Sequence, residues 1–230
     1  MEVKRGIYGQ IIADSLPAEV RQRIFEMVNR AASADKVDEH GSWDFGIKGD
    51  GTRFAALNWD TYGAGYDAHT GELLAVIQVR KTEKTTRRGF ANTRKNYFLI
   101  GTNEDGTTFA HSVSAHTVHS AIRMGVNVIK AVQDWIFGGD YTAMIRQGDL
   151  ALVPLKRRPA KGRGKRTAIL EHSHKLSAGN ILEADNKVYA LDPKLTHIPE
   201  THPPVEGKGW YRVVVGKRAD FWKFAAPTVD

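Results

Sequence analysis

Short apolar runs alternate with turn-forming dipeptides from Trp43 to His111, and this alternation limits the possible folds more than any other feature. The runs are candidate strands at 43–47, 53–59, 73–81, 97–101 and 107–111. Asp50-Gly51 and Asp105-Gly106 each separate two runs, and Asp-Gly between strand-like segments is a strong hairpin signal. We therefore predict an antiparallel meander, with 80–95 as the long loop between its third and fourth strands.

Three helices are expected around this meander. The first begins at Ser15-Leu16-Pro17, where a serine N-cap precedes a first-turn proline, and it runs to about Ala32. Ser114 and Asn127 are N-cap residues for two further helices, at 115–124 and 128–137. The last helix has too few polar residues to read base edges, so a packed helical hairpin is favoured over a DNA-reading helix-turn-helix.

Short strands separated by Gly, Pro, Asn or Asp occupy the chain from about residue 144 onward. This spacing is typical of a small β-barrel or sandwich. We thus predict an α+β protein, with an α+β domain at 1–140 and an all-β domain at 141–230. A chain of 230 residues is long enough for each domain to bury a core of its own.

Positive charge is concentrated in two short segments. Residues 80–95 hold seven basic side chains and one acidic one, and residues 156–166 hold seven basic side chains and no acidic one. These 14 of the 33 Lys and Arg residues leave 19 basic and 25 acidic residues in the rest of the chain. Such concentration indicates a surface that binds a polyanion. The residues predicted to contact nucleic acid are Arg87, Arg88, Arg94, Lys95, Arg157, Arg158, Arg163, Lys165 and Arg166.

Aromatic residues near the first basic segment have two interpretations. They could stack on unpaired bases, or they could belong to the core, as tryptophans in strands commonly do. The residues concerned are Trp43, Trp59, Tyr62 and Tyr66.

The absence of cysteine excludes disulfides, Cys-ligated zinc and thiol catalysis. The N-terminus has no apolar core long enough for a secretory signal, and no apolar run reaches the roughly 18 residues of a membrane span. We expect a cytoplasmic protein without a membrane partner.

Four of the nine histidines fall in two clusters, His172 with His174 and His197 with His202. Residues two apart on a strand share a face, so His172 and His174 could present two imidazoles side by side. A histidine from the second cluster would complete the three- or four-nitrogen set that zinc accepts, with iron, nickel and copper as alternatives. The other interpretation is that these are surface histidines near a turn.

A carboxylate accompanies each cluster, Glu171 the first and Glu200 the second. Either could orient a ligand imidazole, or take the proton of a metal-bound water in a catalytic site. A second histidine run, His111, His116 and His119, has no accompanying carboxylate and is a weaker candidate for a ligand set.

Residues 145 to 218 resemble a group of small bacterial and phage proteins of unassigned function. The shared features are Arg146-Gln147-Gly148-Asp149 before an apolar strand, the His172/His174 pair, Thr196-His197 through His202-Pro203, and Gly209-Trp210-Tyr211-Arg212-Val213. This resemblance implies that the β-domain is a recurring unit. A fainter similarity is to cupins, which place H-x-H, a glutamate and a later histidine around a metal; here the next glutamate after His174 is Glu183.

Three functions fit these features. The first is a nucleic-acid-associated metal-binding protein, of phage or bacterial defence origin, with its metal in the β-domain. The second is a non-catalytic nucleic-acid-binding accessory subunit with structural histidines, and the third is a cupin-like small-molecule metalloenzyme. The sequence leaves open whether the protein is an enzyme, and whether it forms a homo-oligomer or joins a larger complex.

Overall fold

The computed structural model describes residues 3–35, 46–47, 53–67, 71–85, 91–102, 108–138, 144–147, 150–159, 161–170, 174–198, 203–217 and 219. For residues 31–35, 46–47, 53–58, 81–85 and 91–94 it describes the backbone only.

The first sheet is an antiparallel meander of five strands, as predicted. Its strands follow one another in chain order: β1 (Gly46–Ile47), β2 (Arg53–Tyr66), β3 (Leu73–Thr85), β4 (Ala91–Thr102) and β5 (Thr108–Val113). The prediction of a long loop at 80–95 is wrong, because β3 and β4 pair in unbroken register from Leu74↔Gly101 to Lys84↔Ala91. Most of this basic segment is therefore strand.

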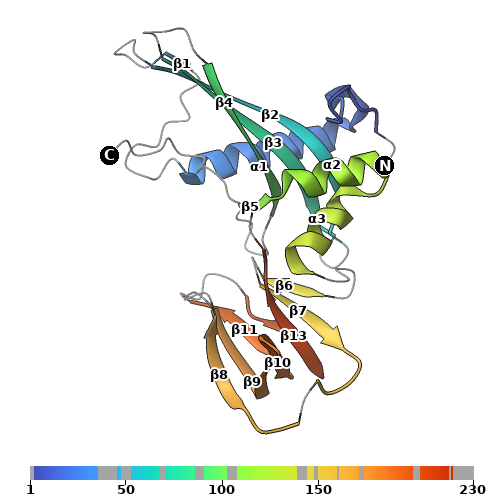
Figure 1. Cartoon of the computed structure of the whole chain (residues 1–230), viewed down its shortest axis with the longest axis vertical. Coiled ribbons are helices and arrows are strands. Elements are labelled where there is room, and N and C mark those ends of the chain that lie inside the picture. The colour runs from blue at the N-terminus through green and yellow to red at the C-terminus, as the bar shows by residue number, and fades with distance from the viewer. Residues whose placement is uncertain are drawn as a thin grey trace.

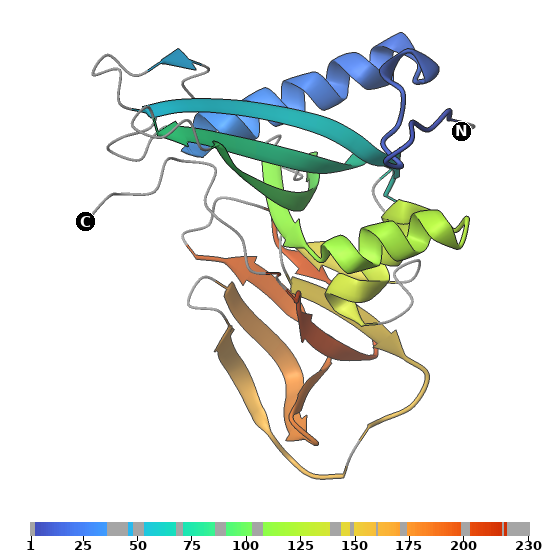
Figure 2. The ribbon, with the colours of Figure 1, turned by 45° about the horizontal axis from the view of Figure 1, so that its top comes forward.

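Helices cover both faces of the first sheet (Figures 1 and 2). The helix α1 (Ala18–Asp35) lies on one face, while α2 (Ala115–Arg123) and α3 (Val128–Phe137) lie on the other. Alternate residues of β3 serve the two sides: Ile77 packs with α1 residues, and Val76 with residues of α2 and α3. This explains why β3 is an almost continuous apolar run.

The predicted helical hairpin is confirmed, with both predicted caps in place. The Ser114 side chain accepts a hydrogen bond from the Thr117 amide, and the Asn127 side chain accepts one from the Lys130 amide. The expected cap of the first helix is wrong. Ser15 lies in the 3-10 turn η1 (Ala13–Ser15), where its hydroxyl donates to the Ile12 carbonyl, and α1 begins three residues later.

The second half of the chain forms an eight-stranded antiparallel sheet. Its strands are β6 (Ile145–Gln147), β7 (Leu150–Leu155), β8 (Lys165–Leu170), β9 (His174–Ala184), β10 (Lys187–Leu191), β11 (Lys194–His197), β12 (Val205–Glu206) and β13 (Trp210–Val215). They are ordered β12-β11-β9-β10-β13-β7-β6, with β8 also paired to β9. The end strands β12 and β6 lie close together, and the Gln147 amide donates to the Pro203 carbonyl at 2.7 Å. The sheet therefore curls into a small barrel.

One apolar cluster joins the two halves. Along β7, Leu150 and Leu152 face the core of the barrel, whereas Ala151 packs with α3 residues such as Val132 and Ile136. After β13 the chain returns to the first half, where the Lys217 amide donates to the Ile136 carbonyl at 2.8 Å. The helical hairpin thus has the first sheet on one side and the barrel on the other.

Candidate functional site

The predicted histidine clusters meet at the start of β9. His174 and His197 occupy directly opposite positions on β9 and β11, with ring centroids 4.7 Å apart and ring planes nearly perpendicular. His174 is only 4 % exposed, while His197 is partly buried. The other members of the predicted site, Glu171, His172, Glu200 and His202, lie outside the described residues.

The described residues bring two imidazoles together here, fewer than a zinc site needs. Zinc sites use three or four protein ligands, and no group of three or more His, Asp or Glu suited to a metal occurs in the described part of the chain. This finding covers the weaker set as well, and its three members bond different groups. His111 bonds the Lys217 carbonyl, His116 lies beside Ser120, and His119 bonds Tyr97.

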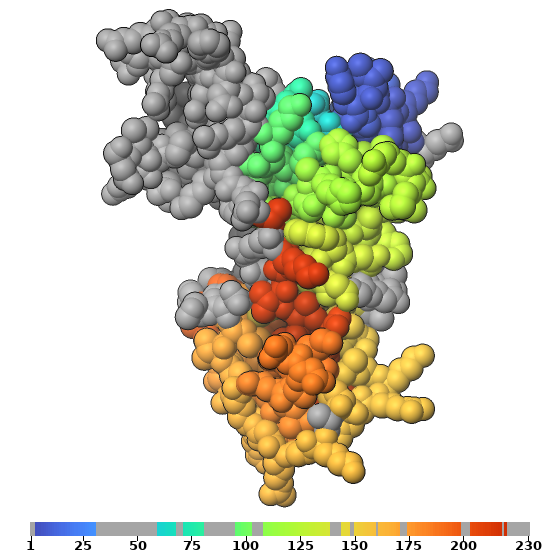
Figure 3. Space-filling model, in the orientation of Figure 1, coloured from blue at the N-terminus to red at the C-terminus, as the bar shows by residue number. Residues whose placement is uncertain are grey.

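The second basic segment forms the connection between β7 and β8 and the first residues of β8. It projects from the end of the molecule farthest from the first sheet, coloured yellow to orange in Figure 3. All seven of its basic residues are exposed. Within the described residues, five of them have no ion-pair or hydrogen-bond partner: Lys156, Arg157, Lys161, Arg163 and Arg166.

The remaining two basic residues hold this segment in place. Lys165 forms an ion pair with Glu183 at 2.7 Å. Arg158 donates to the Gly162 carbonyl at 2.6 Å, and its guanidinium lies 5.7 Å from the Trp210 ring centroid. The Gly164 amide also donates to the Asn180 side chain at 2.7 Å. The segment is therefore an anchored loop that presents its other cations to solvent.

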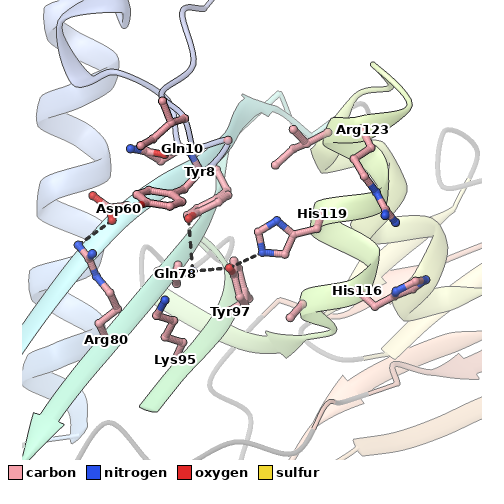
Figure 4. A pocket seen from close by; sticks show the side chains of 15 residues that line it. Tyr8, Gln10, Asp60, Gln78, Arg80, Lys95, Tyr97, His116, His119 and Arg123 are labelled. Atoms are coloured by element: carbon pink, nitrogen blue, oxygen red, sulfur yellow. Dashed lines mark hydrogen bonds and ion pairs between the residues drawn. The ribbon is translucent and has the colours of Figure 1, made fainter. Parts of the chain in front are cut away.

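The first basic segment contributes to a pocket on the first sheet. Arg80 and Lys95 are cross-strand partners on β3 and β4, and both line the pocket. Arg87 and Arg88 lie outside the described residues, as does the side chain of Arg94. The pocket has a volume of about 1240 Å³ and lies between β2–β4, α2 and the N-terminal turn that contains Tyr8 (Figure 4).

A β-bulge shapes the floor of this pocket. The register of β2 and β3 shifts between Thr61 and Gly63, so that Tyr62 and Gly63 both face the helical hairpin. A Cβ atom on Gly63 would lie 3.1 Å from the Val128 side chain. The missing side chain at Gly63 thus lets α3 pack closely, while Tyr62 reaches into the pocket.

Hydrogen bonds connect the polar side chains of the floor (Figure 4). The Gln78 amide nitrogen donates to the hydroxyls of Tyr62, at 3.3 Å, and Tyr97. The Tyr97 hydroxyl in turn shares a hydrogen bond with Nε2 of His119 at 2.7 Å. The three rings pack edge to face, with Tyr97 and His119 centroids 5.4 Å apart. This network fixes the His119 ring against the sheet.

Burial keeps the tyrosines of the floor protonated. It raises the pKa of Tyr97 to about 12, an effect that the hydrogen bond from Gln78 partly opposes. Burial likewise raises the pKa of Tyr62, and here the hydrogen bond with Tyr97 opposes it. Both phenols are therefore neutral hydrogen-bonding groups at physiological pH.

Positive charge lies on two walls of the pocket. On the sheet, Arg80 pairs with Asp60 at 2.7 Å, and the exposed Lys95 is the cross-strand neighbour of Arg80. On α2, Arg123 is exposed and donates to the Ser120 hydroxyl at 3.1 Å. An anion that enters the pocket meets cations on both sides.

Sequence reasoning reached only part of this pocket. It noted the basic segment, a stacking role for Tyr62 and a separate role for His119, but it did not connect them. It missed Gln78 and Tyr97 altogether. The sequence did contain one signal for this network, because Gln78 interrupts the apolar run of β3. A buried polar side chain needs a hydrogen-bond partner, so a glutamine at this position predicts other polar side chains nearby.

Arg146 and Gln147, the first two residues of the R-Q-G-D sequence, make structural contacts. Arg146 lies 3.9 Å from the Asp67 carboxylate, and its guanidinium is 4.5 Å from the Phe109 ring centroid. The contact between Gln147 and Pro203 joins the ends of the barrel sheet. Arg146 therefore connects the two halves, and Gln147 helps to close the barrel.

No helix in the described part of the chain is long and apolar enough to cross a membrane. Comparison with protein-family models, curated proteins and solved structures finds no match to this chain.

Proposed function

We propose that this protein binds nucleic acid through the anchored basic loop at 156–166. The observation that carries the proposal is the exposure of five cations without partners among the described residues, on a segment that contains no acidic residue. Exposed lysines and arginines that meet phosphates release the counterions condensed on the nucleic acid, and this release drives binding.

The anchoring of the loop favours a binding role over a merely soluble surface. Arg158, Lys165 and Gly164 tie the loop to the barrel, so binding does not have to order a long flexible segment. The rest of the chain carries more acidic than basic residues, which directs a polyanion towards the basic segments.

The direct test is binding of labelled duplex DNA or RNA to a loop variant in which Arg157, Lys161, Arg163 and Arg166 are changed to Gln. A matched control changes four exposed lysines outside the loop to Gln: Lys4, Lys175, Lys187 and Lys208. Both variants lower the formal net charge from +7 to +3. We expect the loop variant to lose binding and the control to keep most of it; equal losses would contradict the proposal.

We also propose that the histidine pair binds a transition metal, with zinc as the leading candidate. The cross-strand contact of His174 with His197 supports this, because it brings together imidazoles from both sequence clusters. The remaining ligands would come from His172 or His202, and Glu171 or Glu200 would orient a ligand. Elemental analysis of the purified protein tests this: zinc, iron, nickel or copper at about one per chain supports the site, and the absence of all four removes it.

A further inference from the structure

We infer that the pocket on the first sheet binds an unpaired nucleotide of a single-stranded nucleic acid. Its base would stack on Tyr8 and its phosphate would lie between Lys95 and Arg123. This inference extends the proposed nucleic-acid binding to a second site. The elements that line the pocket, β2–β4 and α2, lie well apart from the connection between β7 and β8 that carries the basic loop (Figures 1 and 2), so the two contributions can be measured separately.

The aromatic side chain at the mouth of the pocket is exposed on a well-anchored turn. Tyr8 is 72 % exposed, and the neighbouring Ile7 is 90 % exposed. The Arg5 guanidinium donates to the carbonyls of Gly9, at 2.7 Å, and Tyr62, at 2.9 Å, which ties the turn to β2. An exposed ring on an anchored turn loses little conformational entropy when a base stacks on it.

The floor of the pocket offers a hydrogen-bonding group to the edge of a base. Nε2 of His119 is engaged by the Tyr97 hydroxyl, so Nδ1 is the ring nitrogen that remains for a ligand. In Figure 4 that second nitrogen points away from Tyr97. Gln78 and Tyr97 hold the ring in position, so its contact with a base requires little rearrangement.

The two cations are placed to bind the phosphate of a nucleotide whose base stacks on Tyr8. Lys95 lines the pocket from β4 and Arg123 lines it from α2. Charges on two walls around an aromatic mouth match the usual single-strand binding groove, in which cations follow the backbone and rings stack on bases. Duplex bases already stack on one another, so they cannot reach Tyr8 in this way.

The size of the pocket favours a segment of strand over a small metabolite. Its volume of about 1240 Å³ exceeds the roughly 300–1,000 Å³ of typical small-molecule sites. A nucleotide in this pocket leaves room for its neighbours in the strand.

The test measures binding of a short labelled oligothymidylate, and of a hairpin duplex, by fluorescence anisotropy. We expect Tyr8→Ala to weaken oligothymidylate binding by roughly 5- to 150-fold, the effect of removing one base–aromatic stack. Tyr8→Phe keeps the ring and should bind as the wild type does. Tyr66→Ala is the matched control, because Tyr66 is also exposed but does not line the pocket. Duplex binding should be unchanged in all three variants.

Charge variants provide a second, independent measurement. Changing both Lys95 and Arg123 to Gln should lower the magnitude of the salt slope for oligothymidylate by about 0.7, the value for the loss of the one phosphate contact that the two cations share. Lys187→Gln is the control for a single exposed lysine outside the pocket.

The outcomes separate this inference from the proposed function. If the loop variant loses both nucleic acids while Tyr8→Ala binds oligothymidylate normally, the loop proposal stands and the pocket inference is overturned. If the loop variant binds both nucleic acids normally but Tyr8→Ala loses oligothymidylate binding, the pocket inference stands and the loop proposal is overturned. Thymidine monophosphate that competes as strongly as the oligothymidylate, at equal nucleotide concentration, would assign the pocket to free nucleotides and overturn the single-strand assignment.

Discussion

The salt dependence of duplex binding measures how many cations of the 156–166 loop meet phosphates. Five of its basic side chains are exposed and have no partner among the described residues. Each phosphate contact adds about 0.9 to the slope of the logarithm of affinity against the logarithm of salt concentration. Five contacts give a slope of about −4.5, which is a loss of affinity of roughly 500-fold for a fourfold rise in salt.

The loop variant removes four of these cations, Arg157, Lys161, Arg163 and Arg166, and keeps Lys156. The magnitude of its salt slope should therefore decrease by about 3.6, from about 4.5 to roughly 0.9. Arg158 is left in place because its contacts with Gly162 and Trp210 hold the loop. Changing it would alter the conformation of the loop as well as its charge, so the two effects on binding could not be separated. A duplex is the appropriate ligand, since the pocket on the first sheet is expected to take unpaired nucleotides only.

The assay is fluorescence anisotropy of a labelled duplex across a salt series, with the four-lysine control measured alongside. The control has the same net charge, so it keeps the wild-type slope if local contacts dominate and follows the loop variant if overall charge does. A loop variant that retains the wild-type slope would refute the assignment of phosphate contacts to the loop.

Three further predictions concern the metal site, the pocket and the loop anchor. His174→Ala should abolish bound zinc measured by elemental analysis, whereas unchanged zinc content would exclude this histidine as a ligand. With the pKa of Tyr97 raised to about 12, the unfolded chain ionises first as pH rises, so stability present below about pH 10 is lost towards pH 12, by at most roughly 2–3 kcal/mol. In urea unfolding, the free energy of unfolding of Tyr97→Phe should therefore decrease less between pH 10 and pH 12 than that of the wild type. An identical decrease would contradict the raised pKa of Tyr97. Gly164→Ala would place a Cβ atom 1.6 Å from the Ile181 carbonyl oxygen, so it should lower the free energy of unfolding by about 1–3 kcal/mol or more; Gly179→Ala, with ordinary 3.5 Å contacts, is the control.

Features encoded by neighbouring residues were predictable from the sequence. Asp-Gly pairs between apolar runs predicted the meander, and Ser114 and Asn127 marked the starts of both hairpin helices. The boundary between strand and loop in the basic segment at 80–95 was not predictable in this way. Charged residues give no period of their own, and only pairing with β2 and β4 shows that β3 continues to Thr85.

The sequence by itself thus determined the α+β class, the order of the elements and the exposed basic loop, because turns, caps and charge runs act over a few residues. Tertiary structure decided the two sites. His174 meets His197 only through the register of β9 with β11, and the pocket needs a bulge at Tyr62 together with residues from three strands and a helix. Register and bulges depend on how a whole sheet packs against its helices, so no local pattern in the sequence specifies them.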